Sequence, residues 1–380
     1  MNHRLDHSVK LDMPIRRYSS LLVGCATLLG GTLQAAAAQS TNPDSARLVT
    51  RDIPNFWRAV DRAAGKDTAA LIAAIRAEYL ANPSPGLSDW ITSRLIDQGA
   101  VGAVLQAKGW DRARATRARS APAGSAERAG FDTVVMPAVL DNAAKNLAWI
   151  YLHRRAYYDA IRPNTLAVDT ARAIKDSIRA SFRRLSALYP EAKYADVYFL
   201  IGRMSSGGTT GESGLLIGTE INGRDPSTPV TELSAWERAV TGQISDLPHM
   251  VAHEMIHTLQ GPRTGPRTLL VSALNEGSAD FLAEVISGSH IINPAYTYGD
   301  AHERELWSEF KAMMDSTNTS AWMYQGDRAP PGRPADLGYW MGYKISKAYY
   351  DRAADKRAAV KEILTYTDAK AFLAASGYGR

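Results

Sequence analysis

Cysteine is almost absent from this sequence. Among 380 residues the only cysteine is Cys25, and it lies in an N-terminal stretch that is typical of an export signal. A mature chain without that stretch would contain no cysteine, which excludes disulfide bonds, thiol nucleophiles and cysteine metal ligands. A metal ion in the mature protein would have to be held by histidine, aspartate or glutamate.

A strong net charge is also missing. The formal charge is +5, with 44 basic and 39 acidic residues scattered along the chain. Without the first 38 residues the counts become 40 and 37. A nearly balanced charge gives no support for nucleic-acid binding, which needs a basic patch or stripe. At 45% apolar residues the chain can bury a core, so a disordered or fibrous protein is excluded.

The N-terminus predicts export. Two arginines precede an apolar run that ends in small residues at position 38, so we interpret residues 1–38 as a signal peptide. The expected location is periplasmic or secreted. The phrase "LVGC" resembles a lipoprotein cleavage box that would lipidate Cys25. Membrane association is expected only if the signal is retained or lipidated.

Residues 39–130 are predicted to form an N-terminal helical region. The stretches starting at Asp52 and Asp67 have apolar residues at helical spacing, and each opens with an aspartate suited to capping. Residues 108–130 contain several arginines among small residues without an apolar period. We interpret them as a solvated loop.

Residues 131–380 are predicted to form the second domain. Helical patterns follow up to about Leu188, with a break near Arg162-Pro163. The stretches "DVYFLIG" and "GLLIGTEI" then predict a β-hairpin around the turn "GGTTGESG", and the second of them is the candidate edge for a bound peptide. After residue 246 the chain is again mostly helical, so the expected fold class is α+β, mainly α-helical.

The motif "HEMIH" lies in a predicted helix that Asp246 can cap and that Pro248 fits in its first turn. His253 and His257 are four residues apart, so both imidazoles point from one helix face and can converge on one metal ion. Glu254 lies about 100° further around the helix, where its carboxylate can reach a metal-bound water rather than the metal.

A catalytic zinc site needs a third protein ligand. The sequence does not have the ligand spacing of a metzincin, because Gln260 and Arg263 stand where glycine and histidine would be needed. A glutamate on the following helix is the alternative. The stretch "LLVSALNEGSADFLAEVISG" supplies Glu276, and the returning helix can bring its carboxylate to the two histidines.

The phrases "HEMIH" and "NEGSAD" together resemble the gluzincin metallopeptidases. The resemblance implies a zincin-like catalytic domain with a small β-sheet beside the active-site helix. It implies Zn²⁺ held by His253, His257 and Glu276, with Asp280 accepting a hydrogen bond from the imidazole of His253. Residues from about 190 to 360 further resemble the predicted zinc-dependent proteases related to bacterial gliding-motility lipoproteins. The phrases that carry this resemblance are "YFLIGRMSSGGT", "GLLIGTE", "HEMIHTLQ", "NEGSADFLAE" and "GYWMGYKISKAYY".

Three further features extend the expected site. Tyr339 and Tyr343 are candidates for stabilising the oxyanion, with His302 behind them, although they could equally be core aromatics. His249 is interpreted as a capping or surface histidine. Gly277 costs a helix about 1 kcal/mol relative to alanine, so we expect close packing there, with the active-site helix as the neighbour.

We therefore expect an exported zinc-dependent peptidase in which Glu254 is the general base and a peptide or protein is the substrate. Catalytic roles are predicted for Glu254, Tyr339 and Tyr343. The alternative is a non-catalytic zinc-binding envelope protein with a structural or interaction role. An aminopeptidase is less favoured, because the sequence lacks a Gly-x-Met-Glu-Asn stretch that would grip a free amine.

Overall fold

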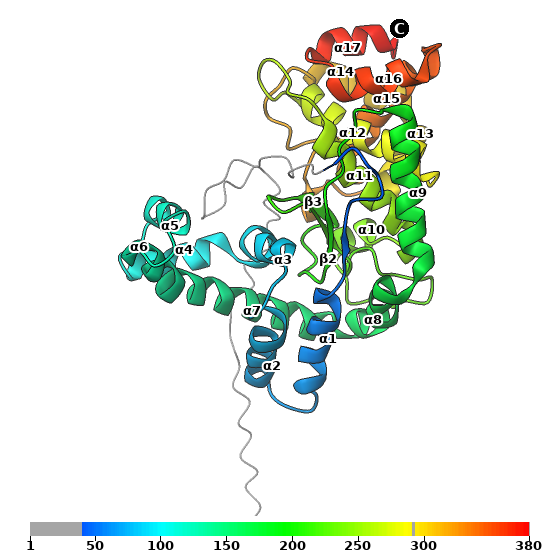
Figure 1. Ribbon diagram of the computed structural model, residues 1–380. Coiled ribbons are helices and arrows are strands. Elements are labelled where there is room, and N and C mark those ends of the chain that lie inside the picture. Colours follow the sequence, from blue (N-terminus) through cyan, green and yellow to red (C-terminus); the bar gives the residue numbers. More distant parts are fainter. Residues whose placement is uncertain (1–39, 291–292, 380) are drawn as a thin grey trace, which may run out of the picture.

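The computed structural model describes residues 40–290 and 293–379. In this part of the chain helices surround one four-stranded sheet (Figure 1). The prediction of a mainly helical α+β fold is confirmed. The predicted signal peptide and Cys25 lie outside the described residues.

The N-terminal region is helical, as predicted. Its α-helices are α1 (Asp52–Arg62), α2 (Thr68–Ala74), α3 (Pro85–Trp90), α4 (Gln98–Ala107), α5 (Arg112–Arg119) and α6 (Ala126–Gly130). Three of them continue into π-helical turns, η1 (Ile75–Tyr79), η2 (Ile91–Leu95) and η3 (Phe131–Val135). Asp67 caps α2 by accepting from the backbone N–H of Ala70, whereas Asp52 lies inside α1 and accepts from the backbone N–H of Ser84 at 3.2 Å.

The arginine-rich stretch is not the loop that we expected. It forms α5 and α6, with Asp111 and Ser125 as the capping residues. The buried side of α5 is made of Ala115 and Ala118, so small residues provide the face that larger apolar residues usually supply. These helices lie at the far end of α7, away from the sheet (Figure 1).

Three helices connect this region to the sheet: α7 (Met136–His153), α8 (Arg155–Thr170) and α9 (Arg172–Leu188). The predicted break at Arg162-Pro163 is wrong, because α8 continues through Pro163. The chain departs from helical geometry at Arg154 and Ala171 instead. A proline inside a helix removes one backbone hydrogen bond, and α8 nevertheless stays helical on both sides of Pro163.

The sheet has the strand order β1-β2-β4-β3. Its strands are β1 (Leu48–Val49), β2 (Val197–Leu200), β3 (Gly208–Thr210) and β4 (Leu215–Gly218). β2 and β4 pair in parallel, so the predicted hairpin between them is wrong. The segment interpreted as a turn contains β3, which pairs antiparallel with β4 and forms the edge. The expectation that β4 is the edge is therefore also wrong.

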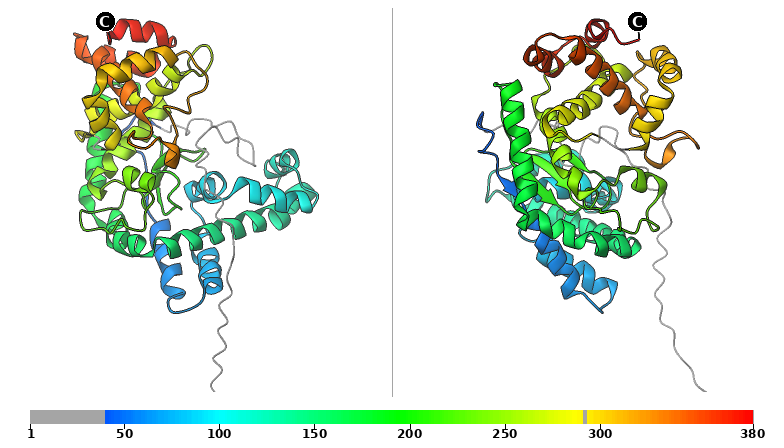
Figure 2. Two further views of the ribbon diagram at one scale, coloured as in Figure 1. Left: turned by 180° about the vertical axis from the view of Figure 1, so that it is seen from behind. Right: turned by 90° about the vertical axis from the view of Figure 1, so that its right-hand side faces the viewer.

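The C-terminal part is helical, and Figure 2 shows its last helices gathered at one end of the molecule. Its α-helices are α10 (Ala235–Val240), α11 (Leu247–Leu259), α12 (Leu269–Ser287), α13 (Pro294–Ala301), α14 (Glu303–Met313), α15 (Leu337–Arg352), α16 (Lys356–Thr365) and α17 (Ala369–Ser376). Two short 3₁₀ turns are η4 (Ile244–Asp246) and η5 (Gly326–Arg328). α11 packs against β3, β4 and α12, and α12 packs extensively against α15.

One hydrophobic core runs through the described chain. It includes residues of the first helices, such as Phe56, together with strand residues such as Phe199 and C-terminal residues such as Phe372. The N-terminal helices therefore share their buried surface with the rest of the fold. The division of the chain at residue 130 stays a prediction.

Candidate metal centre

Helix α11 presents two imidazoles on one face. Pro248 lies in the first turn, where the missing N–H costs no hydrogen bond. Asp246 precedes the helix but makes no side-chain cap to it, so that part of the expectation is wrong. The Nε2 atoms of His253 and His257 are 3.0 Å apart, and the two rings meet edge to face. Both side chains are largely buried, so they meet away from bulk water.

Helix α12 returns along α11 and brings Glu276 to the pair. Its Oε2 lies 3.7 Å from His253 Nε2 and 3.2 Å from His257 Nε2. Three donors of one tetrahedral zinc ion stand roughly 3.3 Å from one another, since each metal–ligand bond is about 2.0–2.2 Å. The three measured separations fall on either side of that value, so the donor set fits a zinc ion.

Each imidazole is held through its other nitrogen. His253 Nδ1 donates to Asp280 Oδ1 at 2.6 Å, and Tyr296 donates its hydroxyl to Asp280 Oδ2 at 2.6 Å. His257 Nδ1 donates to Gln260 Oε1 at 2.8 Å. With Nδ1 used in this way, Nε2 is the atom of each ring that faces the carboxylate of Glu276. Nε2 is therefore the nitrogen that each imidazole can offer to a metal ion.

The third ligand is oriented in the same way. Tyr324 donates its hydroxyl to Glu276 Oε1 at 2.8 Å, so the other oxygen, Oε2, is the one that faces the histidines. The two imidazoles hold the pKa of Glu276 well below its usual range, against the opposing effect of burial. The carboxylate is therefore ionised and ready to bind a cation.

Glu254 lies beside this group, against the edge strand β3. The side chain is buried, and burial raises its pKa, while the neighbouring imidazoles act in the opposite direction. A Cβ atom at Gly208 would lie only 2.5 Å from Glu254 Oε1. A glycine at this position of β3 is therefore needed to make room for the carboxylate. The glycine-rich segment thus serves the site rather than a simple turn.

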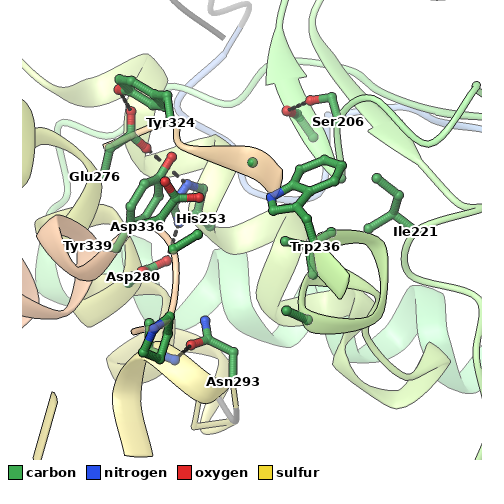
Figure 3. Close-up of a pocket in the computed structure, with 18 of the residues that line it drawn as sticks. Ser206, Ile221, Trp236, His253, Glu276, Asp280, Asn293, Tyr324, Asp336 and Tyr339 are labelled. Atoms are coloured by element: carbon green, nitrogen blue, oxygen red, sulfur yellow. Dashed lines mark hydrogen bonds and ion pairs between the residues drawn. The ribbon is translucent and has the colours of Figure 1, made fainter. Parts of the chain in front are cut away.

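The group lies in an open cleft of about 1240 Å³. Figure 3 shows its two sides: Glu276, Tyr324, Asp336 and Tyr339 lie on one, and Ser206, Ile221 and Trp236 lie across from them. The first side comes from α12, α15 and the chain between α14 and α15. The second comes from β3 with its preceding segment, from the segment that follows β4, and from α10. A cleft of this size is large enough to hold a bound ligand.

Of the two tyrosines that we considered as oxyanion donors, only one lies in the cleft. Tyr339 lines the cleft, and its pKa is raised well above the usual value by burial and by the charge of Glu276. Tyr343 does not line the cleft; its hydroxyl donates to Glu284 Oε2 at 2.8 Å. His302 stacks on Tyr298 and bonds its backbone carbonyl, so it does not stand behind either tyrosine of the prediction.

Two other expectations are corrected. His249 is buried rather than on the surface, and its Nδ1 lies 2.9 Å from the carbonyl oxygen of Ser289. The close packing at Gly277 is confirmed, but its neighbour is α15 rather than the active-site helix. A Cβ atom there would lie 2.1 Å from the backbone nitrogen of Tyr343 and 2.4 Å from the carbonyl oxygen of Tyr339.

The sequence did not reveal three orienting residues: Gln260, Tyr296 and Tyr324. Gln260 could have been found from the sequence, because it lies three residues after His257, at the end of the same predicted helix. Tyr296 and Tyr324 come from segments far along the chain, and Tyr324 has a φ of 55°. Only the folded chain shows that these two hydroxyl groups meet the site.

The fold and the site define a mainly helical α+β protein with a His-His-Glu group able to hold a metal ion. Residues 130–380 match the family described as gliding motility protein GldB. The chain therefore belongs to this family, which confirms the relation to gliding-motility lipoproteins. No curated protein and no solved structure matches the chain.

Family membership indicates an envelope-associated protein. The family description refers to motility and not to peptide hydrolysis, so it favours the non-catalytic alternative over the peptidase. Within the residues that the structure describes, no helix has both the length and the apolar character needed to cross a membrane.

Proposed function

We propose that this chain is an exported zinc-dependent peptidase with a zincin-like catalytic domain of the gluzincin type. The observation that carries the proposal is the position of Glu254. A buried carboxyl group stands next to the three-residue ligand group, in a cleft that is open to a polymeric substrate. A purely structural zinc site has four protein ligands and no use for a proton acceptor beside it.

In this proposal His253, His257 and Glu276 hold the zinc ion. When bound, zinc supplies a Lewis acid that polarises the scissile carbonyl and lowers the pKa of a water molecule to about 7. Glu254 accepts the proton of the attacking water and returns it to the leaving amine. The carboxyl group of Glu254 is buried beside the ligand group, a position from which it can take a proton from water and return it.

The other residues keep these groups in place. Asp280 and Gln260 fix the imidazoles so that Nε2 faces the cleft. Tyr324 selects which oxygen of Glu276 faces the histidines. Tyr339 lines the cleft beside Glu276 and is the remaining candidate for stabilising the oxyanion. The expected location is the periplasm or the cell exterior, and the expected substrate is a peptide or protein.

The test compares the wild type with Glu254→Gln after loading with zinc. We expect one zinc per chain in both proteins by elemental analysis, and cleavage of a peptide library by the wild type alone. Cleavage by both proteins would show a contaminating protease or a different base. A wild type that cannot be loaded with zinc would contradict the proposal altogether.

A second candidate function is a non-catalytic zinc-binding envelope protein with a structural or interaction role. Membership of the gliding motility family favours it. The same experiment separates the two: this function predicts one zinc per chain and no cleavage of any library peptide by either protein.

A further inference from the structure

An arginine of the N-terminal region reaches the candidate site. Arg94 belongs to η2, and together with Ser93 it lines the cleft. Both residues precede the part of the chain that matches the family, which begins at residue 130. The N-terminal helices therefore contribute a cation to a site whose metal-ligand group comes entirely from α11 and α12.

Arg94 is bound to the edge strand through both its side chain and its backbone. Its Nη2 donates to Thr209 Oγ1 at 2.9 Å. Its carbonyl oxygen accepts from Arg203 Nε at 2.7 Å and from Ser205 Oγ at 3.3 Å. Arg203 and Ser205 belong to the segment that leads into β3, so the position of Arg94 relative to this strand is fixed from two sides.

Thr209 is the neighbour of Gly208, the glycine that makes room for Glu254. Arg94 is therefore bound to the part of β3 that packs against Glu254. In the proposed reaction Glu254 returns a proton to the leaving amine. The side of the cleft next to Glu254 is therefore where the leaving part of the substrate lies.

The other arginines of the cleft are placed differently. Arg267 contacts the hydroxyl of Tyr324 at 3.4 Å, and Tyr324 bonds the ligand Glu276. Arg333 Nη1 pairs with Glu309 Oε2 at 2.7 Å. Among the arginines that line the cleft in the described chain, only Arg94 is bound to the strand beside Glu254.

We propose that Arg94 binds a carboxylate on the leaving-group side of a peptide substrate. This inference rests on the proposed peptidase function and names its substrate class. A guanidinium group presents several N–H donors in one plane and matches a carboxylate with two parallel hydrogen bonds. The carboxylate can be the C-terminus of the peptide or an acidic side chain of the leaving residue, since both offer the same chemistry.

The experiment uses the full zinc-loaded chain and matched peptides, starting from a peptide that the wild type cleaves. One pair differs only in a free or amidated C-terminus, and a second pair has Asp or Asn in the leaving residue. We expect wild-type kcat/KM to be roughly 10- to 100-fold higher for the carboxylate member of one pair. Arg94→Gln should abolish this preference mainly through KM, and Arg94→Lys should retain part of it.

Arg333→Gln is the matched control, because Arg333 also lines the cleft but pairs with Glu309 and not with a residue of the ligand group. Its carboxylate preference should equal that of the wild type. A preference that survives in Arg94→Gln, disappears in Arg333→Gln, or is missing from both peptide pairs in the wild type would overturn the inference. Circular dichroism and zinc content establish that each variant is folded and loaded, and Arg94→Lys provides the test if Arg94→Gln does not fold.

Binding to zinc-loaded Glu254→Gln separates this inference from the proposed function. Fluorescence anisotropy of the same labelled peptides should show the carboxylate preference, and the double variant with Arg94→Gln should lack it. Equal binding of both members of each pair overturns the inference even if the wild type cleaves peptides. A carboxylate preference in binding without any cleavage by the wild type contradicts the peptidase and supports the role of Arg94 as an anchor.

Discussion

At the scale of single residues, the ligand group depends on side chains that never touch the metal position. His253 and His257 each donate Nδ1 to a different acceptor, Asp280 and Gln260. Glu276 is held by the hydroxyl of Tyr324. These partners fix the tautomer of each imidazole and the orientation of the carboxylate, which are properties that the ligand motif alone leaves open.

Replacement of the carboxylate partner should weaken metal binding. In Asp280→Asn the imidazole of His253 loses its charged acceptor and becomes a poorer donor to the metal, so we expect zinc affinity to fall about 10- to 100-fold. Competition with a fluorescent chelator measures the affinity. Asp315→Asn is the control, because Asp315 is exposed and pairs with Lys370 on the surface. Equal zinc affinity in both variants would contradict the orienting role of Asp280.

The hydroxyl groups of Tyr324 and Tyr343 should contribute differently to zinc affinity. Tyr324→Phe removes the hydrogen bond to Glu276, and a hydrogen bond to a charged group contributes about 1.5–3 kcal/mol, so zinc affinity should fall at least tenfold. Tyr343→Phe removes only the bond to Glu284 and should leave zinc affinity unchanged. Isothermal titration of the metal-free proteins provides the comparison, and a larger loss in Tyr343→Phe would contradict the assignment.

At the scale of elements, the site depends on how α12 is held between α11 and α15. Gly277 follows the ligand Glu276 directly, and it lets the backbone of α15 come close to α12. Gly342 on α15 faces the same contact, because a Cβ atom there would lie 1.8 Å from the carbonyl oxygen of Ala273. Two glycines therefore set the spacing of these helices and bring Tyr339 near Glu276.

A methyl group added at Gly277 should destabilise the fold. Alanine normally stabilises a helix relative to glycine by up to about 1 kcal/mol, but Gly277→Ala must push α15 away and should lower the free energy of unfolding by about 1–3 kcal/mol or more. Urea unfolding measures the change. The control is Gly99→Ala in α4, where only the flexible side chain of Asp97 lies near. A stabilised Gly277→Ala protein would show that the two helices can move apart freely.

Strand pairing shows the limit of local sequence patterns. The apolar stretches that form β2 and β4 were recognised as strands, but their parallel pairing was not. Apolar alternation predicts an extended segment and contains no information about its partner. The edge strand β3 consists of Gly208, Thr209 and Thr210, which look like turn residues. Its place beside Glu254 follows from the fold.

At the scale of the whole molecule, one buried carboxyl group holds the segment that follows β2, and α8 is bonded to the same segment. Glu220 is fully buried and accepts from the backbone N–H groups of Gly202 and Met204. Tyr158 of α8 donates to the carbonyl oxygen of Gly202, and Tyr157 donates to that of Glu220. The segment that precedes β3 is thus anchored to the core, and burial raises the pKa of Glu220 to about 7.

This carboxyl group should make stability depend on pH. Because the pKa of Glu220 is higher in the folded chain than in the unfolded chain, its contribution is complete below about pH 4.5 and is lost as pH rises through about 7. A shift from 4.5 to about 7 corresponds to about 3 kcal/mol.

The measurement compares the free energies of unfolding of the wild type and Glu220→Gln between pH 5 and pH 8. The wild type should lose stability relative to the variant as the pH rises, because glutamine does not ionise. A constant difference across this range would show that Glu220 does not titrate there.

The helical character of most of the chain could be predicted from local patterns, and so could the four residues His253, Glu254, His257 and Glu276. Periodicity and ligand spacing within a helix are local properties, so a single sequence contains them. The partner of each strand, the position of Tyr343 outside the cleft, and the positions of Tyr324 and Arg94 inside it are seen only in the folded chain. Those positions depend on contacts between segments far apart in the chain, and such contacts are fixed only when the shared core forms.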